Sequence, residues 1–318
     1  MTTERVSASS RPSSDFHHAA FIYSGEDDFL EGMVPFLRAG ATNGDAMLVA
    51  VGARKIALLT DALGADAAAV RFEDMTQIGR NPAWIIPAWN DFVAANPGRS
   101  LRGIGEPIYS SRTSAELVEC QRHEALLNVA FAGTPDFQLL CPYDIDTLDD
   151  DVLREALATH PVVQHGAATE TSASYLGLDT IAAPFDKPLP VAPTDARQMP
   201  FTIDSLTDAR TFAADAALDM GFRAERVEEV VLAVSEIATN SVRHGGGGGL
   251  LRSWSDGRTL IVEITDDGSI GDPLAGRRRP RPDQEGGYGL WLVNRLSQLV
   301  QVRTSNGGTV IRVHFAPA

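Results

Sequence analysis

The first half of the chain alternates short apolar runs with amphipathic stretches. Strands are predicted for the apolar runs at residues 19–23, 46–51, 70–72, 101–104 and 137–140. Helices are predicted for the stretches with a helical repeat at residues 27–39, 54–63, 82–95, 114–131 and 149–159. Strands that alternate with helices form a mostly parallel sheet covered on both faces. Residues 16–165 are therefore expected to form one α/β domain.

The second half has a different pattern. Strands are predicted at residues 199–203, 250–254, 259–266, 300–304 and 309–315, and helices at 207–220, 224–243 and 288–296. Two hairpins are indicated by the turn pairs Asp256-Gly257 and Asn306-Gly307. Residues 196–318 are therefore expected to form an α+β domain, in which helices cover one face of an antiparallel sheet.

The segments outside these two domains have a biased composition. Residues 166–195 are rich in Ala, Thr, Ser and Pro, which is typical of a semi-extended linker. Residues 1–15 are rich in Ser and Thr and have no apolar run, so we expect a disordered N-terminus and no signal peptide. No apolar run approaches the roughly 20 residues that span a bilayer. Together with the absence of a disulfide framework, this predicts a cytoplasmic protein without a membrane partner.

The net charge of −15 lies almost entirely in residues 1–195. Proteins that bind nucleic acids carry clustered Lys and Arg, because these residues neutralise phosphates. An acidic N-terminal half therefore argues against direct binding of nucleic acid.

One predicted helix carries a polar strip. Glu236, Asn240 and His244 are spaced by four residues, so they share one face of this helix. Apolar residues between positions 227 and 237 supply a packing face beside them. Taken alone, the strip is equally compatible with a solvated helix surface. Two later glycine motifs in the chain decide between a solvated strip and a binding face.

These glycine motifs stand at two points where a ligand can approach the backbone. Asp266 ends an apolar strand, and Gly268 comes two residues later. Gly287 and Gly289 stand at the start of a predicted helix, just before Leu290. Free N–H groups at a helix N-terminus favour phosphate. The polar strip and these motifs, in this order, predict a nucleotide pocket that uses no P-loop lysine.

Residues 199–316 resemble the ATP-binding domain of the GHKL superfamily, which includes gyrase, histidine kinases and MutL. The resemblance implies a Bergerat fold that binds ATP and Mg²⁺ beneath a mobile lid, here the loop of residues 267–287. It implies that Asn240 ligates Mg²⁺, that Asp266 accepts a hydrogen bond from the adenine amino group, and that Gly268 passes close to the base. Gly287 and Gly289 would lie beside the phosphates.

Within this superfamily the domain is most similar to the anti-sigma factor/serine kinase branch, typified by RsbW. Glu236 would then be the general base that activates a serine hydroxyl of a partner. The implied partner is an anti-anti-sigma protein of the STAS fold or a sigma factor, and a homodimer is left open. A histidine kinase that phosphorylates itself is disfavoured, because no histidine lies between His165 and His244.

The resemblance is incomplete in the first glycine motif. Ile270 stands where the family has a second glycine, and Gly271 follows one position late. An alternative is therefore a module that binds ATP without catalysis, or no longer binds it, and sequesters a partner. Four arginines in the lid are compatible with a γ-phosphate contact, an acidic partner or a solvated basic loop: Arg277, Arg278, Arg279 and Arg281.

Residues 16–165 resemble the MEDS sensory domain of methanogen and methylotroph regulators. The similarity rests on the segments His18-Ala-Ala-Phe-Ile-Tyr23, Phe36-Leu-x-x-Gly40, Gly103-x-Gly-Glu106-Pro, His123-Glu124-Ala-Leu-Leu-Asn128, Cys141-Pro-Tyr-Asp144 and His160-Pro161. It implies a RecA-like α/β scaffold and a small-molecule ligand.

Two groups of residues are candidates for a site in this domain. Glu106 ends a predicted strand, where open sheets place ligands, and with Tyr23 and Tyr143 it could line a sensory pocket. A second group consists of His18, His123, Cys141 and His160. Their spacing fits no standard metal template, so satisfied structural residues are favoured over a metal site.

Overall fold

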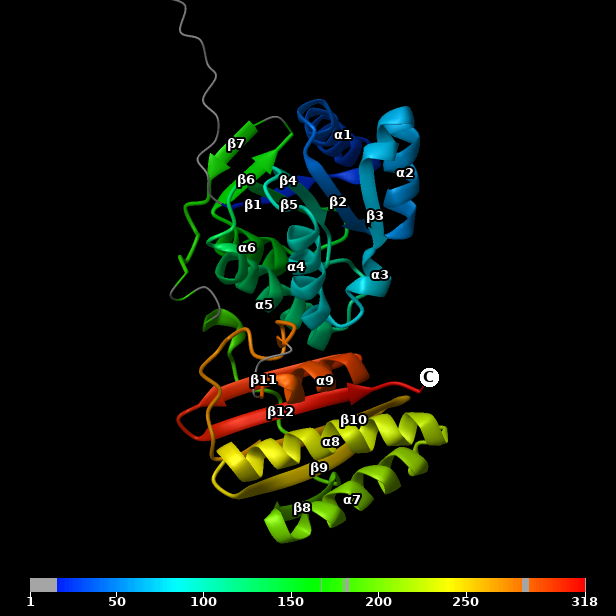
Figure 1. Ribbon diagram of the computed structural model, residues 1–318, viewed down its shortest axis with the longest axis vertical. Coiled ribbons are helices and arrows are strands. Elements are labelled where there is room, and N and C mark those ends of the chain that lie inside the picture. The colour runs from blue at the N-terminus through cyan, green and yellow to red at the C-terminus, as the bar shows by residue number, and fades with distance from the viewer. Residues whose placement is uncertain (1–15, 167, 179, 181–182, 282–285, 318) are drawn as a thin grey trace, which may run out of the picture.

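The protein is described here from a computed structural model, which describes residues 16–166, 168–178, 180, 183–281 and 286–317. The expected disordered N-terminus lies outside these residues. The N-terminal domain is built on a seven-stranded sheet in the order β3-β2-β4-β5-β1-β6-β7 (Figure 1). Its strands are β1 (His17–Tyr23), β2 (Ala46–Val51), β3 (Val70–Asp74), β4 (Leu101–Gly105), β5 (Phe137–Asp144), β6 (Val162–His165) and β7 (Ala168–Thr171). All neighbours are parallel except β6 and β7, which form an antiparallel hairpin.

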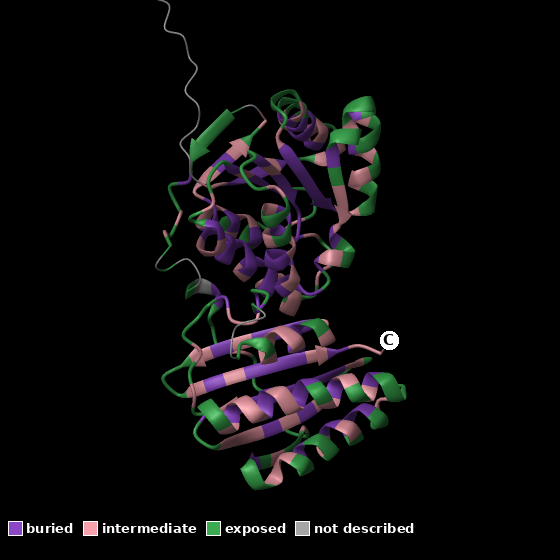
Figure 2. Ribbon diagram, in the orientation of Figure 1, coloured by how far each residue is buried: buried purple, intermediate pink, exposed green. Residues whose placement is uncertain are grey.

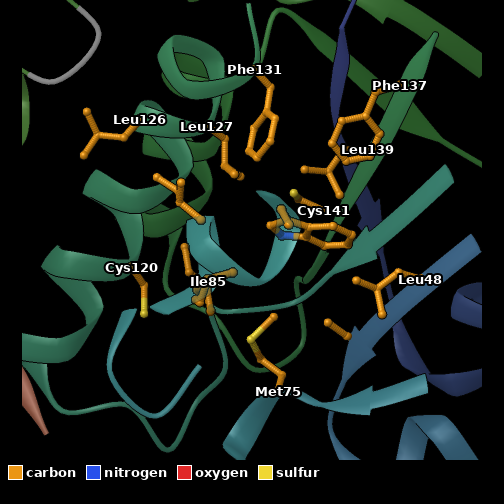
Figure 3. Close-up of a cluster of buried hydrophobic side chains, with 14 of the residues drawn as sticks. Leu48, Met75, Ile85, Cys120, Leu126, Leu127, Phe131, Phe137, Leu139 and Cys141 are labelled. Carbon is orange, nitrogen blue, oxygen red and sulfur yellow. The ribbon is translucent and has the colours of Figure 1, made fainter. Parts of the chain in front are cut away.

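Helices cover both faces of this sheet, because its strands bury apolar side chains on both sides. One face packs against α1 (Gly25–Asn43) and α2 (Ala53–Leu63). The other packs against α3 (Met75–Ile78), α4 (Ile85–Ala95), α5 (Ser114–Phe131) and α6 (Asp150–Thr159). Helix α5 begins where expected, since Thr113 and Glu116 form a capping box. Figure 3 shows how Phe137 and Leu139 of β5 face Leu127 and Phe131 of α5.

The segment between the domains is more ordered than its composition suggests. Strand β7 extends the sheet to residue 171, so the expected boundary at residue 165 falls inside a hairpin. Further along, Phe185 is buried against Ala125. The chain then crosses the C-terminal sheet, where Arg303 donates to the Lys187 carbonyl at 3.1 Å and Arg312 donates to the Pro190 carbonyl at 2.6 Å.

The C-terminal domain contains a five-stranded antiparallel sheet in the order β11-β12-β10-β9-β8. The strands are β8 (Arg197–Thr202), β9 (Gly248–Asp256), β10 (Thr259–Asp266), β11 (Leu299–Ser305) and β12 (Gly308–Phe315). The helices α7 (Leu206–Asp219), α8 (Ala224–His244) and α9 (Tyr288–Leu296) form a layer on one face of the sheet, joined by a shared core. Figure 2 shows exposed residues on the outer surface of α7. The expected fold class is confirmed for both domains.

The two domains contact each other through a polar and apolar interface. In α9 the Asn294 carbonyl accepts hydrogen bonds from Trp84 Nε1 at 2.7 Å and from Asn81 Nδ2 at 3.1 Å. The Arg295 guanidinium lies 4.3 Å from the centre of the Trp84 ring. Leu274 of the lid is buried in the core of the N-terminal domain. The lid and α9 therefore both touch the N-terminal domain.

No helix among the described residues has the length and apolar character needed to cross a lipid bilayer.

Candidate functional site

A cavity of about 560 Å³ opens between α8, the end of β10, the lid and the start of α9. Most of the residues expected in a nucleotide pocket line it, namely Asn240, His244, Asp266, Gly268, Gly287, Gly289 and Leu290. They come from three separate segments of the chain, which the helix layer and the sheet bring together. The volume lies within the range typical of small-ligand sites.

Helix α8 presents its polar strip to this cavity because its opposite face is committed to the core. Val230, Val234 and Ile237 are buried against the sheet. Asn240 and His244 line the cavity, and His244 is exposed. The helix ends at its C-cap, Gly245, which packs tightly on Asp266: a Cβ on Gly245 would lie 2.5 Å from Asp266 Cγ.

Asp266 is held in place by two donors. Its Oδ2 accepts a hydrogen bond from Ser241 Oγ at 2.5 Å, and its Oδ1 accepts one from the Gly268 N–H at 2.8 Å. Each carboxylate oxygen can accept a further bond, so Asp266 remains able to bind an amino group in the cavity. The Gly268 carbonyl in turn accepts from Thr309 Oγ1 at 2.9 Å.

Sequence reasoning did not single out Ser241 or Thr309. Ser241 directly follows Asn240 on α8, and Thr309 pairs with Asp266 in the register of β10 and β12. The Asn306-Gly307 turn fixes the register of β11 with β12, not that of β10 with β12, so it gives no signal that Thr309 lies beside Asp266. Ser241 could have been found because it comes one position after Asn240 of the polar strip.

Gly289 allows α9 to approach α8 closely. A Cβ on Gly289 would lie 2.7 Å from Asn240 Nδ2 and 3.3 Å from Glu236 Oε2. The preceding Gly287 has a φ of 84°, a left-handed conformation that favours glycine. The first turn of α9 thus lies beside Asn240, where its free N–H groups suit an anion.

Glu236 lies at the edge of this arrangement. It does not line the cavity itself, but its carboxylate lies beside the first turn of α9, next to Asn240. Its side chain is half-buried. Glu236 is thus a neighbour of two residues that line the cavity, Asn240 and Gly289, without lining it itself.

The lid contains the departure from the family motif. Ile270 lines the cavity and also packs against the core of the C-terminal domain. Its N–H lies 3.4 Å from Thr304 Oγ1. The isoleucine therefore serves as an apolar wall of the cavity, held by the sheet beneath it.

The lid arginines have different environments. Arg277 is buried and donates to Glu119 of α5 at 3.2 Å. Burial lowers the pKa of Arg277 to about 10, which leaves it charged at neutral pH. Arg278 and Arg279 line the cavity, and Arg279 also lies 3.6 Å from Asp91. Arg277 and Arg279 thus both pair with carboxylates of the N-terminal domain, and Arg278 and Arg279 line the cavity.

The three residues expected in a sensory pocket do not share one pocket. Tyr23 donates to Glu106 Oε1 at 3.1 Å, and Lys55 binds both of them. Tyr143 pairs in register with Ile22, not with Tyr23, so its side chain points to the opposite face of the sheet. There it packs with the α5 and α6 core.

Burial of Glu106 raises the pKa of its carboxyl, and the neighbouring Lys55 ammonium opposes this shift. Lys55 was not expected as a partner because it lies on α2, far from Glu106 in sequence.

The four histidine and cysteine candidates for a metal site also do not all lie together. His18, Cys141 and His160 meet in the core of the N-terminal domain, together with Glu124. His123 is buried away from this group, and neither of its ring nitrogens has a hydrogen-bond partner among the described residues. Glu124 was not expected to be a site residue.

Comparison with known proteins agrees with the division of the chain into two domains. The family "MEthanogen/methylotroph, DcmR Sensory domain" (MEDS) matches residues 17–161, and the family "Histidine kinase-like ATPase domain" matches residues 199–315. The serine-protein kinase RsbW of Halalkalibacterium halodurans is 29% identical over 109 residues, which cover 30% of this chain and 67% of that protein.

Two solved structures show weaker similarity. The RsbU and RsbW domains of a Mycobacterium tuberculosis protein match with 18% identity and a TM-score of 0.29, over 39% of this chain and 33% of that one. The histidine kinase AdeS of Acinetobacter baumannii matches with 13% identity and a TM-score of 0.23, over 38% of this chain and 67% of that one. By its two family matches, the chain joins a MEDS domain at residues 17–161 to a histidine kinase-like ATPase domain at residues 199–315, and it is similar to the serine-protein kinase RsbW.

Proposed function

We propose that the C-terminal domain binds ATP with Mg²⁺ and transfers the γ-phosphoryl group to a serine of a STAS-type anti-anti-sigma protein. The observation that carries this proposal is the convergence of Asn240, Asp266 and Gly289 on one cavity, with Glu236 beside it. Asp266 has free acceptor capacity for the adenine amino group. The amide oxygen of Asn240 is a ligand of the kind that Mg²⁺ accepts.

Glu236 would act as the general base. In the proposed step the partner's serine oxygen bonds to the γ-phosphorus, the bond to the bridging oxygen of ADP breaks, and the serine proton passes to Glu236. The position of Glu236 at the cavity edge, beside Asn240 and the first turn of α9, supports this role. The residue is half-buried, so a docked partner would complete its enclosure.

The N-terminal domain would act on this site through the lid. Leu274 is buried in the N-terminal core, and Arg277 pairs with Glu119 of α5. A signal that moves α5 would therefore change how the lid closes over the cavity. A ligand of the N-terminal domain would regulate the kinase by this route.

A second candidate is sequestration of a sigma factor or STAS protein without phosphoryl transfer. It is favoured by Ile270, which fills a cavity wall where the family has glycine. In this account ATP sets the shape of the lid, and Glu236 is dispensable.

Phosphoryl transfer to a candidate STAS protein in ATP and Mg²⁺, read by intact-mass spectrometry, tests the proposal. We expect Glu236→Gln to slow transfer by at least about 100-fold, because general bases contribute about 10²–10⁴. Its ATP affinity should stay near that of wild type. Glu228→Gln, an exposed position of the same helix, is the matched control and should transfer normally.

ATP binding without any transfer to the partner would favour sequestration. Normal transfer by Glu236→Gln would refute its role as the base.

A further inference from the structure

Four side chains that commonly ligate metals meet in the core of the N-terminal domain. His18 comes from β1, Glu124 from α5, Cys141 from β5, and His160 directly follows α6. One potential ligand atom from each lies within 4.8 Å of all the others. All four residues are at most 1% exposed. Figure 3 shows Cys141 following Phe137 and Leu139 along β5, on the side of the sheet that α5 covers.

The hydrogen bonds of His18 direct its Nε2 lone pair into the cluster. Asn128 Nδ2 donates to three backbone carbonyls, including that of Thr159 at 2.9 Å, so the amide oxygen must face the other way. That oxygen lies 3.2 Å from His18 Nδ1. Nδ1 of His18 therefore carries the proton and donates, which leaves Nε2 unprotonated in the neutral ring.

His160 is oriented in the same way. Its Nδ1 lies 2.9 Å from the Ala156 carbonyl, which can only accept a hydrogen bond. In the neutral ring its Nε2 therefore carries the lone pair, and this atom lies in the cluster, 3.2 Å from Glu124 Oε2. Histidines that ligate a metal commonly have their far nitrogen fixed in this manner, by a carbonyl or amide oxygen.

With both rings neutral, the cluster places two Nε2 lone pairs beside the Glu124 carboxylate, and the Cys141 thiol is the donor that these atoms share. His18 Nε2 lies 3.2 Å from Glu124 Oε2 and 3.3 Å from Cys141 Sγ. Glu124 Oε1 has no hydrogen-bond partner among the described residues. Two imidazolium rings would repel each other strongly, since the ring centres of His18 and His160 are only 4.1 Å apart.

A divalent cation at the centre of the cluster would accept a lone pair from each of the four side chains. Ligands at about 2.0–2.3 Å from a tetrahedral zinc ion lie about 3.3–3.8 Å from one another. Three separations in the cluster are 3.2–3.3 Å, and all four ligand atoms lie within 4.8 Å of one another. Two imidazoles, a thiolate and a carboxylate match the preference of zinc for nitrogen, sulfur and carboxylate ligands. A thiolate and a carboxylate also balance the two charges of the ion, so the whole site is neutral in an apolar core.

We propose that His18, Glu124, Cys141 and His160 bind a zinc ion inside the N-terminal domain. Binding releases the Cys141 thiol proton to solvent and forms the zinc–thiolate bond. The ion joins β1 and β5 to α5 and to the residue that follows α6. Helix α5 also carries Glu119, which pairs with Arg277 of the lid. The ion thus fixes the helix that contacts the C-terminal domain, whether or not that domain is a kinase.

Metal analysis of the untagged full-length protein, combined with Co²⁺ substitution, tests this site. We expect about one zinc ion per chain, and in the Co²⁺ form a tetrahedral d–d spectrum with a thiolate-to-cobalt charge-transfer band. Cys141→Ser should lose the charge-transfer band and bind zinc at least about 100-fold more weakly. Cys120→Ser is the matched control, because Cys120 is equally buried but lies outside the cluster.

The wild-type measurement stands even if Cys141→Ser does not fold. A wild-type chain that takes up neither zinc nor Co²⁺ after chelation, and whose unfolding temperature zinc does not raise, would overturn the proposal. Zinc retained equally by Cys141→Ser would also overturn it, because that metal would be adventitious surface zinc.

Discussion

Arg277 of the lid donates a hydrogen bond to Glu119 of α5 at 3.2 Å, and both side chains are buried. Arg303 of β11 lies 2.8 Å from the other oxygen of the same carboxylate. One carboxylate of the N-terminal domain is thus shared by two guanidinium groups of the C-terminal domain. The loop that encloses the candidate nucleotide cavity is therefore held from the neighbouring domain.

Removal of this carboxylate should destabilise the protein and free the lid. Glu119→Ala leaves two buried guanidinium groups unpaired, and we expect the free energy of unfolding to fall by about 3–5 kcal/mol. Urea denaturation measures this loss. Glu31→Ala, at an exposed position of α1, is the control and should change the free energy by less than about 0.5 kcal/mol. A loss that small for Glu119→Ala would show that the pair does not hold the domains together.

The close approach of α9 to Asn240 predicts that a side chain at position 289 will disturb the cavity. In Gly289→Ala the new Cβ would lie 2.7 Å from Asn240 Nδ2, so the amide must move. We expect ATP affinity, measured by calorimetry, to fall at least about tenfold, or about 1.4 kcal/mol. Gly133→Ala serves as the control, because its Cβ would meet no atom within 4 Å. Unchanged affinity in Gly289→Ala would place the nucleotide elsewhere.

Lys55 should determine how stability depends on pH. Burial raises the pKa of Glu106, and Lys55 opposes that rise. In Lys55→Met the pKa of Glu106 should rise further, so the folded state holds a proton that the unfolded state releases. Stability is then full below the unfolded pKa and is lost as pH rises through the folded pKa.

We expect the urea midpoint of Lys55→Met to fall, relative to wild type, as pH rises above the usual carboxyl pKa toward the raised pKa of Glu106. Lys187→Met removes an exposed lysine and should keep the wild-type profile. Parallel pH profiles for Lys55→Met and wild type would contradict the role assigned to Lys55.

The order of elements could be read from the sequence because it is encoded locally. The predicted helix at residues 114–131 has the observed bounds of α5, since its capping box is a local signal. Strands β6 and β7 were both missed. All four residues of β7 are exposed, so this strand has no alternation of apolar and polar positions. Its pairing with β6 depends on the turn between them, not on burial.

Within the sites, the residues that were missed are partners supplied by tertiary contacts. Glu124 and Lys55 gain their roles from side chains far away in sequence, which no local pattern reveals. Tyr143 was grouped with Tyr23 although the two side chains leave opposite faces of the sheet. The error arose because the face on which a side chain lies depends on strand register, and a change of one residue in register moves it to the opposite face.

Nucleotide binding by Asn240 tests the central claim most directly. Titration of ATP into wild type and Asn240→Ala, each with Mg²⁺, should show one site in wild type and at least about tenfold weaker binding in the variant. The difference should shrink when EDTA removes Mg²⁺, because the asparagine acts through the metal. Equal affinity in the two proteins with Mg²⁺ present, or no binding by either, would contradict the account.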